Sequence, residues 1–169
     1  MKKKLIIIFT ICLIAILFFI FAITKTREGM SRLGCANNIK NITLCLHIYA
    51  QKYDGWFPDK NGDAGLEQLR KSLKSEIKWI TKPHFFTCPS TNNGKDFKIT
   101  YDYHAGYKID SKNIGIIMDK IGNHKNFGNI GFVDGRVLPF KGKDWRKNAD
   151  IPIKNQSVAS PNDETTNTN

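Results

Sequence analysis

The sequence predicts an α+β fold in which one long N-terminal helix, membrane-spanning in its first half, packs on a small antiparallel sheet. The first observation is an uncharged apolar run over residues 5–24. The second is a single apolar stripe at helical spacing that continues from this run to Tyr53. The third is a series of short segments after Phe85 that are rich in β-branched and aromatic residues, as strands are.

Residues 1–24 are expected to form a membrane anchor. The run of 20 uncharged residues is long enough, at about 1.5 Å per residue, to cross a hydrocarbon layer of about 30 Å. A cleaved signal peptide is an alternative, but the run is longer than usual for one and no small-residue cleavage site follows it. A lipoprotein signal that ends at Cys35 is a second alternative, but charged residues separate that cysteine from the apolar run. We therefore expect a single-pass protein with its N-terminus in the cytoplasm and its domain outside, although the basic residues on the two sides nearly balance.

The second part of the helix is expected to form one wall of the core. Its apolar positions, spaced by 4, 3, 4, 3 and 4 residues, are Cys35, Ile39, Ile42, Leu46, Tyr49 and Tyr53. This spacing places them on one face of a helix, so the opposite face meets water. Asp54-Gly55 and the following Trp56-Phe57-Pro58 end the helix, because glycine and proline both favour non-helical backbone there.

Residues 25–145 are predicted to form one small α+β domain. A short amphipathic helix is expected around residues 66–74. The expected strands are residues 98–104, 113–118, 129–133 and 136–140, and Asp134-Gly135 between the last two is a two-residue hairpin signal. Residues 146–169 are polar and without periodicity, and are expected to form a disordered tail.

The net charge of +11 is high, but the lysines are scattered along the chain and form no basic block. A solvated basic surface is the simplest interpretation. Contact with anionic lipid or wall polymer and contact with nucleic acid are the alternatives, and nucleic acid is the less favoured of the two. Charge alone therefore identifies no partner.

The cysteines fit a domain outside the cytoplasm. Cys12 lies inside the membrane segment, Cys35 lies on the buried stripe, Cys45 borders it, and Cys88 lies in a loop. In an oxidising compartment Cys35 with Cys88 is the preferred disulfide, which would restrict the unfolded chain by about 4 kcal/mol in the entropy model. Cys45 with Cys88 is the competing pair, and free buried thiols that behave as small apolar residues stay open.

Three segments carry a resemblance to a known family. They are CANNIKNITLCLHIYAQKYDGWFPD, then FTCPS, and a closing NHKNFGNIGFVDGRVLPF in which His124 is followed by nine residues and then Asp134-Gly135. Over roughly residues 25–140 the chain resembles bacterial pseudopilin-like proteins related to type II secretion and type IV pilin subunits, in the prepilin-type, processing-associated branch named for its H-x9-DG ending. The resemblance implies a pilin-like fold, and it implies membrane lipid and other pilin-like subunits as partners of the N-terminal helix.

The chain departs from this family at the cleavage and methylation signature. The family has a glycine followed by Phe-Thr-Leu-Ile-Glu, and aligning Phe9-Thr10 with it puts Ile8 at the glycine and Leu13 at the glutamate. We therefore expect no leader processing, and the missing glutamate puts ordinary polymerisation in question.

No cofactor is expected from the motifs. Residues 59–63 place oxygen ligands at the odd positions of a calcium loop, but Ala64 and Arg70 stand where an EF-hand needs glycine and glutamate, so a plain polar turn is favoured. Major pseudopilins of type II systems bind calcium in the sheet region, but those ligands do not map onto this chain by motif. Zinc-ligand types occur at His84, Cys88, His104 and His124. No CxxC or HExxH brings two of them together, so no metal site is predicted.

The pattern favours a non-catalytic protein without a small-molecule substrate. No nucleophile elbow and no paired acidic signature occurs in the sequence. Structural roles are expected for Asp134 and Gly135, as a turn with a positive φ at the glycine, and for His124, bonding across to that hairpin. The expected function is a membrane-anchored pseudopilin-like subunit of an envelope secretion or pilus-type assembly. The alternative is a stand-alone membrane-tethered domain that binds a polyanion, either wall polymer or nucleic acid.

Overall fold

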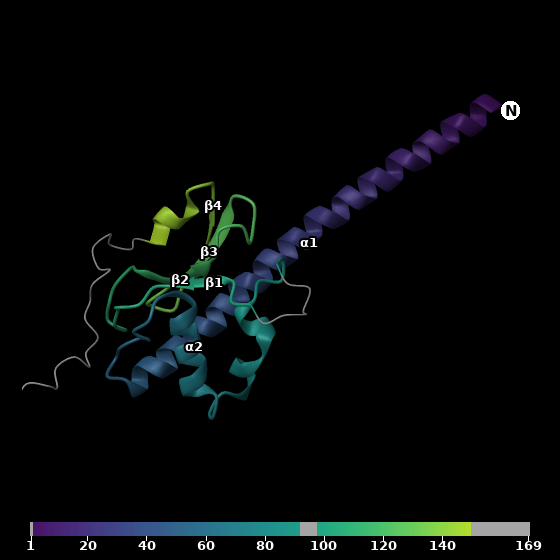
Figure 1. Ribbon diagram of the computed structural model, residues 1–169. Helices are drawn as coiled ribbons and strands as arrows, with labels where there is room; N and C mark the ends of the chain where they lie inside the picture. The colour runs from purple at the N-terminus through teal and green to yellow at the C-terminus, as the bar shows by residue number, and fades with distance from the viewer. Residues whose placement is uncertain (1, 92–97, 150–169) are drawn as a thin grey trace, which may run out of the picture.

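A long helix and a four-stranded antiparallel sheet form the molecule, as expected. The computed structural model describes residues 2–91 and 98–149 (Figure 1). The helices and strands are α1 (Lys2–Lys52), α2 (Gly62–Leu73), β1 (Tyr101–Tyr103), β2 (Gly115–Asp119), β3 (Phe127–Phe132) and β4 (Val137–Lys141). Three 3-10 helices, η1 (Lys78–Thr81), η2 (Pro83–Phe86) and η3 (Trp145–Ala149), complete the described part of the chain. The strands lie in the order β1-β2-β3-β4, each antiparallel to its neighbour.

Helix α1 passes through two environments without a break. Its first half projects away from the domain as a bare rod (Figure 1). There the large apolar side chains between Ile6 and Ile23 stay exposed, from 48% at Leu13 to 73% at Phe18. Among the described residues, α1 is the helix that is long and apolar enough to cross a membrane. The structure therefore supports a transmembrane-capable N-terminal helix.

The second half of α1 packs on the sheet. Five of the six predicted stripe residues are buried, from Cys35 to Tyr49, and Cys45 on the same helix is buried too. The helix comes close to β3 because Gly131 has no side chain: a Cβ there would lie 2.7 Å from Thr43 Oγ1 and 2.8 Å from Ile39 Cγ2. Cys35, Ile39 and their neighbours thus form one core with the inner face of the sheet.

The other elements cover the rest of the sheet. Helix α2 packs against β1 and α1, and its buried residues Leu66, Leu69 and Leu73 join the main core. A second, smaller cluster contains Met118, Ile130, Phe132, Trp145 and Ala149, where η3 packs on β3 and β4. The sheet is therefore covered on both faces in this region.

Two predicted boundaries are corrected by the structure. Tyr53 was predicted to close the buried stripe but is 45% exposed, because α1 ends at Lys52 and Tyr53 lies in the turn, stacked on Tyr49 with ring centroids 4.1 Å apart. The tail was predicted to begin at residue 146, but η3 continues the domain to Ala149, which is buried. The rest of the predicted tail, residues 150–169, lies outside the described residues.

The connection between β3 and β4 has the predicted positive φ at Gly135, but it is longer than the predicted two-residue turn, because residues 133–136 separate the two strands. Gly135 has a φ of +89°, which glycine adopts without steric cost, and its N–H donates to Phe132 O at 2.9 Å. One carboxylate oxygen of Asp134 accepts from the Arg136 N–H at 3.0 Å, and the other pairs with the Arg136 guanidinium. The aspartate thus holds the turn through its side chain.

Candidate functional site: a buried cluster of cysteine, aspartate and histidine

Four side chains with metal-ligating atoms meet beneath α1. Cys35 comes from α1, Cys88 from the loop after η2, Asp119 from the end of β2, and His124 from the loop between β2 and β3. One ligand atom from each lies within 4.8 Å of every other, and all four residues are buried. The fold thus brings together residues that span 90 positions of the sequence, from 35 to 124.

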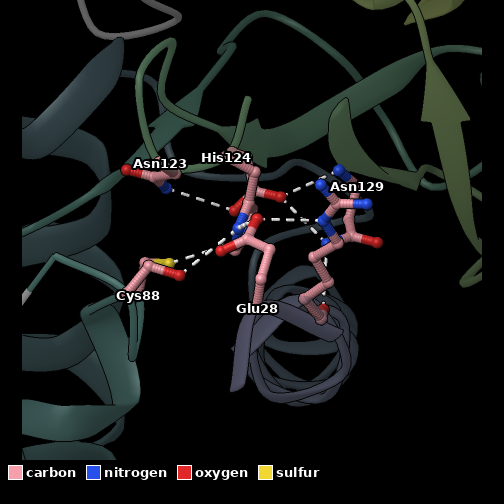
Figure 2. A network of polar contacts seen from close by, with 8 residues as sticks. Glu28, Cys88, Asn123, His124 and Asn129 are labelled. Atoms are coloured by element: carbon pink, nitrogen blue, oxygen red, sulfur yellow. Dashed lines mark hydrogen bonds and ion pairs between the residues drawn. The ribbon is translucent and has the colours of Figure 1, made fainter. Parts of the chain in front are cut away.

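His124 points into this cluster and is held from two sides. Its Nε2 lies 3.5 Å from Cys88 Sγ, and its Nδ1 lies 3.1 Å from Glu28 Oε1 and 3.3 Å from Ser90 Oγ. Figure 2 shows Glu28 rising from α1 toward the ring while Cys88 approaches from another segment. The prediction that His124 bonds across to the hairpin is wrong in its partner: the loop turns the ring toward α1 instead. The histidine nearest Gly135 is His47, whose Cε1 would lie 3.8 Å from a Cβ at that glycine.

Asp119 is buried and surrounded by hydrogen-bond donors. Its Oδ2 accepts from the Asn129 backbone N–H at 2.8 Å and from Asn129 Nδ2 at 2.9 Å, and its Oδ1 accepts from Asn123 Nδ2 at 3.2 Å. Asn123 in turn donates to Thr100 O at 2.8 Å, and Asn129 donates to Arg32 O at 3.3 Å. These amides, Asn123 and Asn129 in Figure 2, fix the carboxylate and connect it to α1 and to the residue that precedes β1.

The cluster perturbs the pKa of each of its members. The hydrogen bond from Cys35, together with that from His124, lowers the pKa of Cys88 to about 5, although burial opposes this. The same hydrogen bond, burial and the charge of Asp119 raise the pKa of Cys35 well above its ordinary value. Burial raises the pKa of Asp119. Burial alone would lower the pKa of His124, but its hydrogen bond to Cys88 and the nearby negative charges outweigh burial and raise it. Of the two thiols in the cluster, Cys88 is therefore the one that ionises more readily, and the raised pKa of His124 favours its charged form next to that sulfur.

The preferred cysteine pair of the sequence is the pair that the fold brings together. Cys35 and Cys88 lie side by side as free thiols, and both are buried. Cys45, the competing partner, is also a buried free thiol, but it is outside the cluster, and burial raises its pKa to about 12. The Cys35–Cys88 disulfide stays a prediction, and the geometry favours Cys35 over Cys45 as the partner of Cys88.

The cluster suits ion binding or a covalent link between the thiols better than catalysis on a substrate. A thiolate beside a histidine is the usual pair for nucleophilic catalysis, but such a nucleophile has to reach its substrate. Cys88 has no exposed surface. Cys88 also lies in the wall of a groove of about 540 Å³, with Thr87 and Pro89 beside it and Gly34 and Asn38 of α1 opposite, but it is 0% exposed, so its sulfur stays covered in this conformation.

The other predicted site residues lie apart from the cluster. His84 is exposed and accepts a hydrogen bond from Asn38 through its backbone carbonyl, and His104 belongs to the segment that follows β1. In the loop considered for calcium, Asn61 Oδ1 accepts from the Ala105 N–H at 2.8 Å and Asp63 pairs with Lys120 at 2.7 Å. The side chains of Asn61 and Asp63 are thus engaged within the protein.

Sequence reasoning missed Cys35 and Asp119 as members of a possible ligand set. The two of these residues that lie nearest in sequence, Asp119 and His124, are five positions apart and do not form a motif of two cysteines or two histidines. The sequence does contain a buried helix cysteine, and a second cysteine and a histidine in loops. That these residues lie together becomes clear only when the strand order is known.

Comparison with known proteins adds no identification. No protein-family model, no curated protein sequence and no solved structure matches the chain. The resemblance to pseudopilin-like proteins therefore stays a hypothesis that depends on the motifs in this sequence alone.

Proposed function

We propose that the chain is a non-catalytic, membrane-anchored, pseudopilin-like subunit of an envelope assembly. Its N-terminus lies in the cytoplasm, its domain lies outside, and α1 docks with the helices of other pilin-like subunits. The observation that carries the proposal is the continuity of α1, which runs from Lys2 to Lys52 with its first half exposed and its second half in the core.

The exposed half of α1 needs an apolar environment. Large apolar side chains cover it all round between Ile6 and Ile23, and contiguous apolar surface of this extent is not stable in water. A bilayer supplies such an environment, and so do the apolar helices of neighbouring subunits within it. The small residue Ala15 and the hydroxyl of Thr10 lie in this stretch, and residues of these types are common where membrane helices pack together.

The apolar surface also continues past the anchor. Met30 and Leu33 are 68% and 73% exposed, although they belong to the part of α1 that enters the domain. They lie one helical turn apart and therefore share a face. A neighbouring α1 that packs in the membrane and continues outward would cover this face, whereas a solitary anchor would leave it in water.

Cysteine cross-linking of the full chain in native membranes tests the proposal. Cys12 is replaced by alanine, and one cysteine at a time is introduced at exposed positions on one face of the anchor, Phe9, Leu13 and Ile16, and on the opposite face, Ile11, Ile14 and Phe18. Oxidation is expected to give cross-linked oligomers, strongest at positions that share one helical face, because helices that pack along a seam approach each other on one side only. A cysteine at Lys71, on the exposed side of α2, is the matched control and is expected to leave the chain monomeric.

The outcome separates the two functional classes. A monomer at every anchor position would contradict the subunit role and favour the tethered polyanion-binding domain, whose binding should then fall steeply with salt. Labelling of the introduced cysteines on intact cells tests orientation, since a reagent that cannot cross the membrane should reach position 71 but not a cysteine at Lys3.

A further inference from the structure

We propose that Cys35, Cys88, His124 and Asp119 form a structural zinc site that fastens α1 to the sheet. This assignment is independent of the proposed subunit role, because it uses only residues of the domain. Zinc-binding sites of this kind use thiolate, imidazole and carboxylate ligands in a closed tetrahedral set, and the four side chains supply two sulfurs, one nitrogen and one oxygen.

The distances fit a tetrahedral ion. With metal bonds of about 2.3 Å to sulfur and about 2.0 Å to nitrogen, a tetrahedral centre separates a sulfur from a nitrogen by about 3.5 Å. Cys88 Sγ and His124 Nε2 are 3.5 Å apart. The widest separation in the set, 4.8 Å, exceeds a tetrahedral edge by about 1 Å, which small side-chain rotations can close.

Hydrogen bonds from the surroundings orient two of the ligands, His124 and Asp119. A histidine that binds zinc through one ring nitrogen usually donates its other N–H to a carboxylate, which fixes the tautomer. Here Nε2 faces Cys88, and Nδ1 lies 3.1 Å from Glu28 Oε1, which also accepts from Arg32 Nε at 3.0 Å. Asp119 is held by the two asparagine side chains described above. The cluster thus has supporting hydrogen bonds on two of its four members.

The burial of the set also favours an ion over bare side chains. As zinc ligands the two cysteines lose their thiol protons to solvent, so the set carries three negative charges, two on sulfur and one on the Asp119 carboxylate. Such charges are costly to bury without a positive partner, and Zn²⁺ at the centre would offset two of the three. It would also link four segments, namely α1, the loop after η2, β2 and the loop before β3, at the point where the rod enters the domain.

A disulfide between Cys35 and Cys88 is the competing state of the same two sulfurs. It would consume both thiolate ligands, so the disulfide and the zinc site exclude each other. Alkylation distinguishes the two states. Thiols that bind zinc become reactive after a chelator is added, whereas thiols in a disulfide become reactive only after a reductant is added.

The test uses the full chain, purified in detergent without chelator and titrated with Zn²⁺ alone. We expect one zinc per chain by elemental analysis, and protection of Cys35 and Cys88 from alkylation until the chelator is added. We also expect the unfolding midpoint to fall when zinc is removed and to rise again, by about 10 °C at a zinc concentration about 100 times its Kd, when zinc is returned. Co²⁺ in place of Zn²⁺ should give a thiolate-to-metal absorption band.

The variants Cys88→Ala and His124→Gln should lose the bound zinc. Cys45→Ala is the matched control, because Cys45 is a buried cysteine of the same helix outside the cluster, and it should keep the zinc. Because the wild-type measurements need no substitution, a variant that fails to fold does not remove the test. The assignment is overturned if the wild-type chain with reduced thiols binds no zinc, if the chain is isolated with a Cys35–Cys88 disulfide, or if both cluster variants keep the metal.

Discussion

Replacing Gly131 with alanine tests the packing of α1 on the sheet. A Cβ at this position would lie 2.7 Å from Ile117 Cγ2, 2.7 Å from Thr43 Oγ1 and 2.8 Å from Ile39 Cγ2, whereas ordinary contacts begin at 3.4 Å. Three neighbours on two elements would therefore have to move apart by roughly 0.7 Å. All three are β-branched and therefore stiff at χ1, and two of them, Ile39 and Thr43, lie on α1, so relief of the overlap requires α1 to move away from the sheet.

The expected cost follows from this overlap. Overpacking of a core by one carbon costs about 1–3 kcal/mol, and the smaller entropy of the unfolded alanine chain offsets about 0.4–1 kcal/mol. We expect a net loss of about 1–2 kcal/mol in the free energy of unfolding, which for a domain of this size lowers the melting midpoint by about 4–8 °C. Urea unfolding followed by tryptophan fluorescence is the suitable assay, because Trp145 is buried in the domain while the detergent-bound part of α1 carries no tryptophan.

Gly29→Ala is the matched control. It lies on α1, and a Cβ there would meet no atom within 4 Å. Alanine favours the helix by up to about 1 kcal/mol relative to glycine, so this variant should unfold no earlier than the wild type. If Gly131→Ala unfolds at the wild-type midpoint, α1 does not pack on β3 as closely as the structure has it.

Two further predictions concern polar side chains of the domain, one buried and one half-buried. Tyr103→Phe should lower the free energy of unfolding by about 1–3 kcal/mol in the same urea assay, because Tyr103 donates to the buried Pro58 carbonyl at 2.7 Å and its removal leaves that oxygen unpaired. His104→Gln should flatten the pH dependence of stability below about pH 6.5: burial lowers the pKa of His104, so the unfolded chain takes up the proton first and the wild type loses stability as the pH falls.

Each of these has its own check. Tyr53→Phe changes an exposed tyrosine in the same way and should alter stability by less than about 0.5 kcal/mol; equal losses in both variants would show that the hydroxyl of Tyr103 is not what matters. For His104, urea midpoints of variant and wild type are compared between pH 7.5 and 5. Burial and the charge of Arg146 lower the pKa of His104, and the charge of Asp102 opposes them. If the urea midpoints of variant and wild type change in parallel with pH, this lowered pKa is contradicted.

The two α-helices and the approximate positions of the strands could be predicted because their signals are local, whereas the order of the strands in the sheet was not predicted. The apolar run and the stripe from Cys35 to Tyr49 are properties of neighbouring residues, and so is the turn at Asp134-Gly135. The failures lie at the ends of elements. Tyr53 continues the stripe by spacing, but the chain leaves the helix one residue earlier, and Ala149 is buried by packing that polar neighbours conceal in the sequence.

The sequence by itself determined that the protein has an uncharged span of membrane length followed by a helical core face and a small antiparallel sheet. Periodicity and turn chemistry are enough for this, since both act over a few residues. Only the tertiary structure decided that His124 faces Cys88 and Glu28 instead of the hairpin, and that Asp119 completes the cluster with Cys35. Those contacts join residues tens of positions apart, and they depend on how closely α1 lies on the sheet, which Gly131 controls and which no local pattern encodes.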